Sequence, residues 1–257
     1  MYTDSSLYNI INISNKMYKE AIKNYLHKTG HANINLKAVL FDMDGVLFNS
    51  MPNHAEAWHK TMAKFGYTLS REEAYMHEGR TGAATINIVS QRERGIDATE
   101  EEIKEIYQAK SDLFNQYPLA ERMPGALEVL TQIKNSGLIP MVVTGSGQTS
   151  LLDRLNQNFP DIFKRELMVT AFDVKYGKPN PEPYLMALKK GGFQPNEALV
   201  VENAPLGVQA GVAAGIFTIA VNTGPLPNHA LLDQGANLLF HSMSDFNEHW
   251  EELKKSF

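Results

Sequence analysis

The sequence contains no cysteine, which excludes disulfide bonds and thiolate metal sites. It also lacks a basic surplus, because its formal net charge is −5, and this argues against nucleic acid as a partner. No apolar run approaches the roughly 20 residues that span a bilayer, and residues 1–32 lack the pattern of a signal peptide. We therefore expect a cytoplasmic protein without a membrane partner, whose metal, if it binds one, has oxygen ligands.

A short apolar stretch ends in paired carboxylates near the start of the chain. Residues 38–41 are apolar and predict a buried parallel strand, and Asp42, Asp44 and Gly45 follow directly. Two carboxylates just beyond a strand end can converge on one point, where they repel unless a cation lies between them. Mg²⁺ is a hard cation that takes oxygen ligands, so this stretch predicts a magnesium site.

The segment that follows is helical throughout. Helical patterns cover residues 54–65, 71–77, 83–94 and 99–114, with no convincing strand among them. Within the last pattern, Thr99 followed by Glu102 is typical of a capping box. The sequence therefore predicts a helical insert after the first strand. The expected domains are an N-terminal extension over 1–34, a catalytic core over 35–51 and 119–257, and a helical cap over 52–118.

Strands and helices alternate in the rest of the chain. The apolar runs that predict strands are residues 138–143, 167–170, 198–201, 217–221 and 238–240. This order indicates an α/β fold, a Rossmann-like doubly wound parallel sheet with helices on both faces.

Polar residues follow several of these strands. Thr144, Lys178, Glu202 and Asn203 lie at or shortly beyond strand ends. Ligands of open α/β sheets bind beyond the carboxyl ends of the strands, so we expect these residues to meet Asp42 and Asp44 in one crevice. Hydroxyl, cation, acid and amide groups together suit a phosphoryl group bound with magnesium.

These stretches resemble the motifs of the haloacid dehalogenase superfamily. The matching segments are 42–46, 143–146, 178–181 and 201–208, and the resemblance extends over about residues 36–250. The helical insert is similar to the small cap domain of the β-phosphoglucomutase-like branch. The resemblance implies a phosphoryl-transfer enzyme with Mg²⁺ as its cofactor.

The resemblance also implies roles for individual residues. Asp42 would be the nucleophile that forms an aspartyl phosphate and a metal ligand, and Asp44 the general acid and base, with its backbone carbonyl on the metal. Thr144 and Lys178 would hold the phosphoryl oxygens. Gly145 and Ser146 would add to this phosphate site, where exposed backbone N–H groups favour an anion.

The metal site departs from the family pattern at Asn203, where an aspartate is usual. An amide oxygen can bind Mg²⁺ but brings no charge, so another carboxylate should compensate. Glu202 is one candidate. Glu78 in the cap is the other, either as a metal ligand on cap closure or as a solvated residue at a helix end.

The cap departs from the mutases of the branch on either side of Gly79. They carry a lysine before this glycine and an arginine three residues after it, and here Glu78 and Gly82 occupy those positions. Arg80 and Lys110 remain as cations for substrate. His54 matches a hinge histidine that assists the acid–base aspartate, or is simply a residue at a helix start.

This charge pattern favours a small, highly charged substrate chelated by magnesium. The stretch 75–82 together with Asn203 is also similar to a pyrophosphatase subgroup of the branch. We therefore expect a monomeric, magnesium-dependent inorganic pyrophosphatase. The alternatives are a sugar-phosphate phosphatase or β-phosphoglucomutase, and, from another class, an inactive phosphate-binding module.

Overall fold

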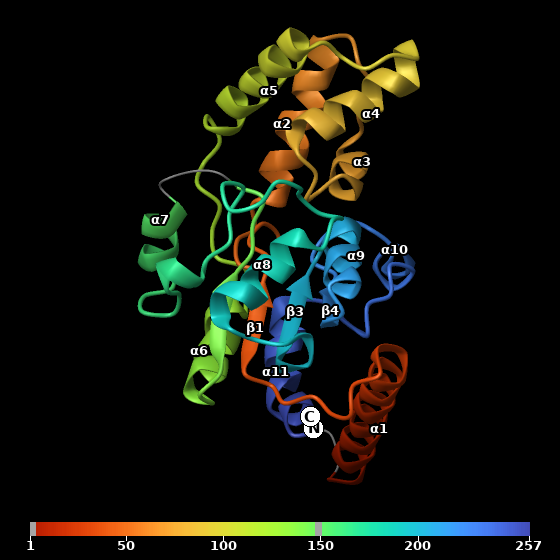
Figure 1. Cartoon of the computed structure of the whole chain (residues 1–257), viewed down its shortest axis with the longest axis vertical. Helices are drawn as coiled ribbons and strands as arrows, with labels where there is room; N and C mark the ends of the chain where they lie inside the picture. The colour runs from red at the N-terminus through yellow and green to blue at the C-terminus, as the bar shows by residue number, and fades with distance from the viewer. Residues whose placement is uncertain (1–3, 147–150) are drawn as a thin grey trace.

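The computed structural model describes residues 4–146 and 151–257, with side chains for 15–146 and 153–257. Figure 1 shows an α/β part below and a helical part above, joined by extended segments. The polar ends of the central strands point toward the junction between these parts.

A parallel sheet forms the centre of the α/β part. Its five strands run in the order β2-β1-β3-β4-β5. They are β1 (Ala38–Phe41), β2 (Ile139–Val142), β3 (Ala198–Glu202), β4 (Phe217–Val221) and β5 (Leu238–Phe240). Phe41 lies opposite Val142 on one side and Val201 on the other. The predicted fold class is therefore confirmed, and the strands that precede Asp42 and Asn203 are neighbours.

The predicted strand over 167–170 is wrong. Residues Arg165–Leu167 form a 3₁₀ turn, and a single parallel bridge joins Val169 to Val143. Thr170 then turns away, because its N–H and hydroxyl both donate to the Asp173 carboxylate, at 2.8 and 2.9 Å. A turn closed by side-chain hydrogen bonds competes with a sheet ladder and ends the pairing.

Helices cover both faces of the sheet, as expected for an α/β fold. On one face, α6 (Ala126–Asn135), α11 (Met243–Lys254) and α7 (Leu151–Asn158) pack against Val39 and Phe41. On the other, α8 (Glu182–Gly191) and α9 (Pro205–Ala213) pack against Ala38 and Leu40. The short α10 (Asn228–Leu232) lies beside α9 and β5. Successive side chains of β1 point to opposite faces of the sheet and therefore belong to two separate cores.

The N-terminal segment forms a single helix, α1 (Asp4–Thr29). Its residues Tyr18, Ile22 and Tyr25 are buried in the same core as α11. The Tyr25 hydroxyl donates to the Gly215 carbonyl at 2.9 Å. The apolar face of this helix therefore packs on the α/β part, at the end of the molecule opposite the helical part (Figure 1).

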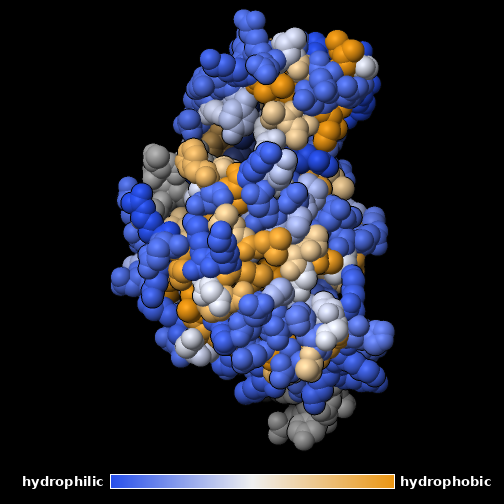
Figure 2. Space-filling view, viewed as in Figure 1, coloured by the Kyte–Doolittle hydropathy of each residue, from blue (hydrophilic) through white to orange (hydrophobic). Residues whose placement is uncertain are grey.

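The helical part consists of α2 (Met51–Lys64), α3 (Arg71–Met76), α4 (Gly82–Arg94) and α5 (Glu100–Phe114). Thr99 and Glu102 form the predicted capping box at the start of α5. These helices enclose a core of their own, which includes Met62, Leu69 and Ile86. Figure 2 shows the two parts as separate masses that meet at a narrower waist. The exact domain boundaries stay a prediction.

None of the helices in the described residues is both long enough and apolar enough to cross a membrane.

Candidate active site at the junction of the two parts

Lys178 lies at the centre of the candidate site. Its Nζ forms an ion pair with Asp42, lies 2.5 Å from Glu202 Oε1 and donates to the Val143 carbonyl at 3.3 Å. All three charged side chains are buried. Burial opposes the charge of Lys178, but Asp42 and Glu202 outweigh it and raise the lysine pKa well above its usual value. Lys178 therefore remains a cation between two carboxylates.

The carboxylates around Asp42 bring more negative charge than Lys178 neutralises. Burial raises its pKa to about 8, and Glu202 and Asp44 add to this rise while Lys178 opposes it. A nucleophilic carboxylate has to be ionised, so this environment favours the arrival of a further cation beside Asp42.

Glu202 has a structural task that occupies both of its oxygens. Oε1 accepts from Lys178 and from the Tyr184 hydroxyl, at 2.5 and 2.8 Å. Oε2 accepts from the backbone N–H of Asn203 and of Ala204, at 3.0 and 3.3 Å. The side chain is buried against Gly207, where any Cβ would overlap it. We therefore remove Glu202 from the expected metal ligands, because its lone pairs are already used.

Asp44 belongs to a second polar network, which reaches into the helical part. Its Oδ1 accepts from the Ser50 hydroxyl at 2.5 Å and lies 3.6 Å from His54 Nε2. Lys110 lies behind the histidine, with Nζ 2.8 Å from His54 Nδ1. Burial raises the pKa of Asp44, but the contacts with His54 and Ser50 outweigh it and lower the value to about 2. Asp44 and the hinge residue His54 are thus neighbours, as the sequence suggested.

Thr144 lies at the end of β2 beside this pair of networks. Its side chain is buried, and its hydroxyl accepts from the backbone N–H of Ser146 at 3.0 Å. Gly145 is exposed, with open space where a Cβ would be. This turn can present a hydroxyl and backbone N–H groups to an anion.

Glu78 reaches the α/β part from the end of α3. The Asn203 amide nitrogen donates to its carboxylate, with Nδ2 3.0 Å from Oε2 and 3.3 Å from Oε1. Burial, followed by the charges of Asp42, Glu202 and Asp44, raises the pKa of Glu78 well above its usual value. This carboxylate is therefore part of the site and is not a solvated residue at a helix end.

The donor set at this point fits magnesium. The other amide atom of Asn203, Oδ1, is buried and makes no hydrogen bond with the described residues. Within the described part of the chain, no group of three or more His, Cys, Asp or Glu side chains is arranged to hold a metal ion. The Asp42 and Glu78 carboxylates are only two such side chains, but together with the Asn203 amide oxygen and the backbone carbonyl of Asp44 they make a set of the oxygen ligands that Mg²⁺ prefers.

A cavity of about 550 Å³ opens beside Lys178 between the two parts. Its lining includes Arg80 and Thr81 from the helical part and Lys175 and Tyr176 from the loop before α8. The Nε atom of Arg80 is buried without a hydrogen-bond partner among the described residues. Arg80 can therefore contact an anionic ligand in this cavity. Lys110 faces His54 instead.

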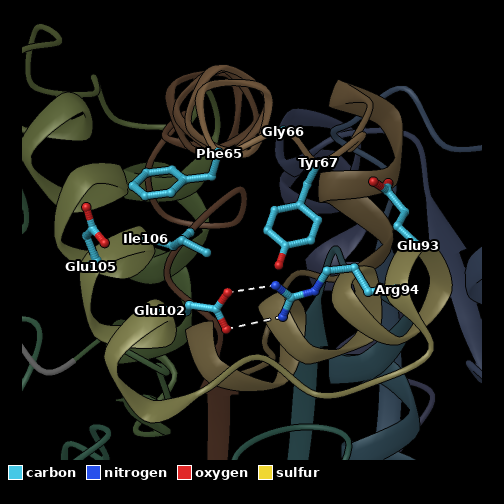
Figure 3. A pocket seen from close by; sticks show the side chains of 8 residues that line it. All are labelled: Phe65, Gly66, Tyr67, Glu93, Arg94, Glu102, Glu105 and Ile106. Atoms are coloured by element: carbon cyan, nitrogen blue, oxygen red, sulfur yellow. Dashed lines mark hydrogen bonds and ion pairs between the residues drawn. The ribbon is translucent and has the colours of Figure 1, made fainter.

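A second cavity, of about 250 Å³, lies inside the helical part. Figure 3 shows Arg94 of α4 paired with Glu102 of α5 across it, with Phe65 and Ile106 on its apolar side. This cavity shares no lining residue with the site around Lys178. We assign it no role in the chemistry.

Sequence reasoning missed several residues that shape the site. Tyr184 hydrogen-bonds Glu202, Ser50 hydrogen-bonds Asp44, and the Phe114 ring stacks on His54 at 4.0 Å between centroids. Each occupies an unremarkable helical or loop position, and only tertiary packing brings it to a polar side chain of the site. No signal in a single sequence marks them.

A profile of haloacid dehalogenase-like hydrolases matches residues 39–221 of the chain. The chain belongs to this family. It is therefore a phosphoryl-transfer hydrolase or mutase, and the sequence-based resemblance to the superfamily is confirmed.

The most similar proteins include phosphatases that act on phosphorylated carbohydrates. Hexitol phosphatase A of Escherichia coli (strain K12) is 31% identical over 72% of this chain and 83% of its own. The phosphorylated carbohydrates phosphatase of Thermotoga maritima is 30% identical over 78% of this chain and 92% of its own. A solved Bacteroides vulgatus structure, provisionally described as a β-phosphoglucomutase, is 78% identical with a TM-score of 0.91 and covers 94% of this chain and 98% of its own. These names support the alternative reading, sugar-phosphate phosphatase or phosphoglucomutase, better than pyrophosphatase.

Proposed function

We propose that the protein is a magnesium-dependent phosphatase that hydrolyses inorganic pyrophosphate through an aspartyl phosphate. The contact between Glu78 and Asn203 carries this proposal. It brings a carboxylate of the helical part to the place where the sugar-phosphate mutases of the branch carry a lysine. A site that offers an anion in place of that cation suits a substrate that arrives with its own metal ion.

In the first step, a carboxylate oxygen of Asp42 forms a bond to one phosphorus atom as the bridging P–O bond breaks. Thr144, the backbone N–H groups near Gly145, and Lys178 stabilise the equatorial oxygens, which is the main task in phosphoryl transfer. Asp44 gives a proton to the departing phosphate. Because its pKa is lowered to about 2 in the free protein, Asp44 takes up this proton only once substrate is bound.

In the second step, Asp44 takes a proton from water, which attacks the aspartyl phosphate and releases the second phosphate. His54 holds Asp44 in place for both proton transfers. Splitting the hydrolysis into two displacements keeps each barrier lower than that of a direct attack by water.

Four groups would hold the metal: the Asp42 carboxylate, the Asp44 backbone carbonyl, Asn203 Oδ1 and Glu78. Mg²⁺ bound there supplies positive charge beside the phosphoryl oxygens. Glu78 restores the negative charge that Asn203 lacks. It also makes the metal site depend on the position of the helical part.

The cap side of the site supports a small substrate. Gly82 stands where the mutases carry the arginine for the distal phosphate, and the Tyr107 ring lies so close to Gly82 that any side chain there would overlap it. Arg80 and Lys175 line the cavity beside Lys178 and offer positive charge to a second phosphoryl group.

The second candidate is a sugar-phosphate phosphatase, which the names of the curated relatives favour. β-Phosphoglucomutase follows from the description of the Bacteroides vulgatus structure. Glu78 and Gly82 count against the mutase, because both positions lose a cation that would grip the distal phosphate.

Phosphate release from purified protein with magnesium distinguishes these candidates. The substrates are pyrophosphate, glucose 6-phosphate and a hexitol phosphate, and a coupled assay with β-glucose 1-phosphate tests the mutase. We expect kcat/KM for pyrophosphate to exceed that for each monoester by about tenfold or more. Asp42→Asn is the control for turnover at this site. A preference for a hexose or hexitol phosphate would replace pyrophosphate by the second candidate.

A further inference from the structure

The end of α3 contacts the α/β part at two points. Glu78 meets Asn203, as described above. Three residues earlier, the Tyr75 ring lies on Gly224, so that a Cβ at Gly224 would be 3.1 Å from both Cδ1 and Cε1 of the ring. Tyr75 also packs on the core of the helical part. This aromatic ring therefore bridges the two parts beside Glu78.

The loop that carries Gly224 is itself fixed to the nucleophile turn. The Thr223 hydroxyl donates to the Gly45 carbonyl at 2.7 Å. Gly45 has a φ of +83° and lies directly against the Asn203 amide, where any side chain would overlap. The contacts thus form a closed ring: Tyr75 to Gly224, Thr223 to Gly45, Gly45 to Asn203, and Asn203 back to Glu78.

The contact between Asn203 and Glu78 depends on charge, because the amide nitrogen donates to a carboxylate at 3.0 Å. The contact between Tyr75 and Gly224 does not. The Tyr75 ring buries apolar surface on a glycine, an attraction that persists whatever the charge state of the carboxylates.

We propose that Tyr75 is a positioning residue for Glu78: by packing on Gly224, it holds the cap carboxylate at Asn203. This rests on the proposed function in one respect, that Glu78 serves the magnesium ion. A side chain at Gly224 would crowd the ring, since even its Cβ would be 3.1 Å from two ring carbon atoms. The hydrogen bond from Thr223 to Gly45 links the same loop to the turn that follows Asp42. The cap is thus connected to this turn through Tyr75.

Magnesium titration by calorimetry tests this role with matched variants. Tyr75→Ala removes the ring, whereas Tyr75→Phe keeps both carbon atoms that face Gly224. Phe65→Ala is the control for loosening the helical part, because Phe65 packs on its core and lines only the second cavity. Hydrogen exchange over residues 71–82 reports the attachment of α3 directly.

We expect Tyr75→Ala to raise the magnesium Kd about tenfold and to speed exchange over 71–82. Tyr75→Phe and Phe65→Ala should bind magnesium as the wild type does. In a Glu78→Gln background, Tyr75→Ala should weaken binding no further, because the residue it positions is gone.

Unchanged magnesium binding in Tyr75→Ala would overturn the inference, as would effects of Tyr75→Ala and Glu78→Gln that simply add. If Glu78→Gln alone left the magnesium Kd unchanged, the metal role of Glu78 would fail and the inference with it. Pyrophosphate turnover is measured separately. Its absence, together with intact coupling between Tyr75 and Glu78, would refute the proposed substrate alone.

Discussion

Lys110 Nζ lies 2.8 Å from His54 Nδ1. A protonated lysine can only donate, so Nδ1 is the acceptor and neutral His54 carries its proton on Nε2, toward Asp44. Burial and the charge of Lys110 both lower the pKa of His54, which keeps the ring neutral. The ring also stacks on Phe114. Asp44 thus faces the N–H of a neutral imidazole 3.6 Å away, whose tautomer is set by Lys110 of α5.

The buried lysine makes stability depend on pH. Burial lowers the pKa of Lys110 to about 8, and Asp44 opposes this only in part. The folded protein therefore releases this proton at a lower pH than the unfolded chain does, and stability rises as pH increases from about 8 toward the usual lysine pKa of about 10.4.

Replacing Lys110 by methionine should remove this dependence. Over that pH range the wild type should gain about 2–3 kcal/mol relative to Lys110→Met, since one pKa unit corresponds to about 1.4 kcal/mol. Urea unfolding at pH 7 and pH 10 measures the difference. Parallel stability curves for the two proteins would show that Lys110 titrates normally.

Asp44 should be needed for proton transfer and should also stabilise the fold. Asp44→Asn retains the shape of the side chain but cannot exchange a proton, so we expect kcat to fall about 10²–10⁴-fold. The thermal midpoint should also fall, because the lowered pKa of Asp44 means that its charge stabilises the fold, although the amide can still accept from Ser50. Steady-state kinetics with the best substrate and a melting curve give the two readouts. A kcat within a few-fold of wild type would assign the acid–base role to another group.

Lys178 should be essential for the fold as well as for activity. Lys178→Met leaves Asp42 and Glu202 buried without their cation, and breaking a buried ion pair in this way costs about 3–5 kcal/mol. Lys190 offers a matched control. It pairs with Asp173 at 2.7 Å, with about a quarter of each side chain exposed. Lys190→Met should cost about 1 kcal/mol or less by the same denaturant titration, and equal losses would contradict the role assigned to Lys178.

Much of the fold was readable because apolar runs and turn residues act locally. The strands over 217–221 and 238–240 and the capping box at Thr99 are confirmed without shift. The strand expected over 167–170 failed because a strand also needs a partner along its length, and the Asp173 turn removes Thr170 from the ladder. Pairing of this kind is a tertiary property that a local pattern does not contain.

The site was readable to the extent that its residues follow strands. Strand ends converge whatever the details of packing, so Asp42, Thr144 and Asn203 could be grouped from the sequence. The different roles of Glu202 and Glu78 could not be predicted from the sequence. Both were candidates for the metal, and only the positions of Tyr184 and the α3 end show that one carboxylate is fully hydrogen-bonded while the other faces Asn203.

An arginine at position 82, where the mutases of the branch carry one, would need a second substitution in the cap. A side chain at Gly82 would overlap the Tyr107 ring, so Gly82→Arg alone should destabilise the helical part by about 1–3 kcal/mol, the usual cost of overpacking. Tyr107 is about half exposed, and removing its ring should open the space. We therefore expect Tyr107→Ala to rescue the stability of Gly82→Arg.

The rescued double variant also tests why the substrate is small. An arginine at position 82 would restore a cation for a distal phosphate, so activity on sugar phosphates should rise relative to pyrophosphate, with Tyr107→Ala alone as the control. If the double variant is as unstable as Gly82→Arg, Tyr107 is not what fills the space. If it is stable but its substrate preference is unchanged, the loss of the arginine does not set specificity, and Glu78 becomes the residue to exchange next.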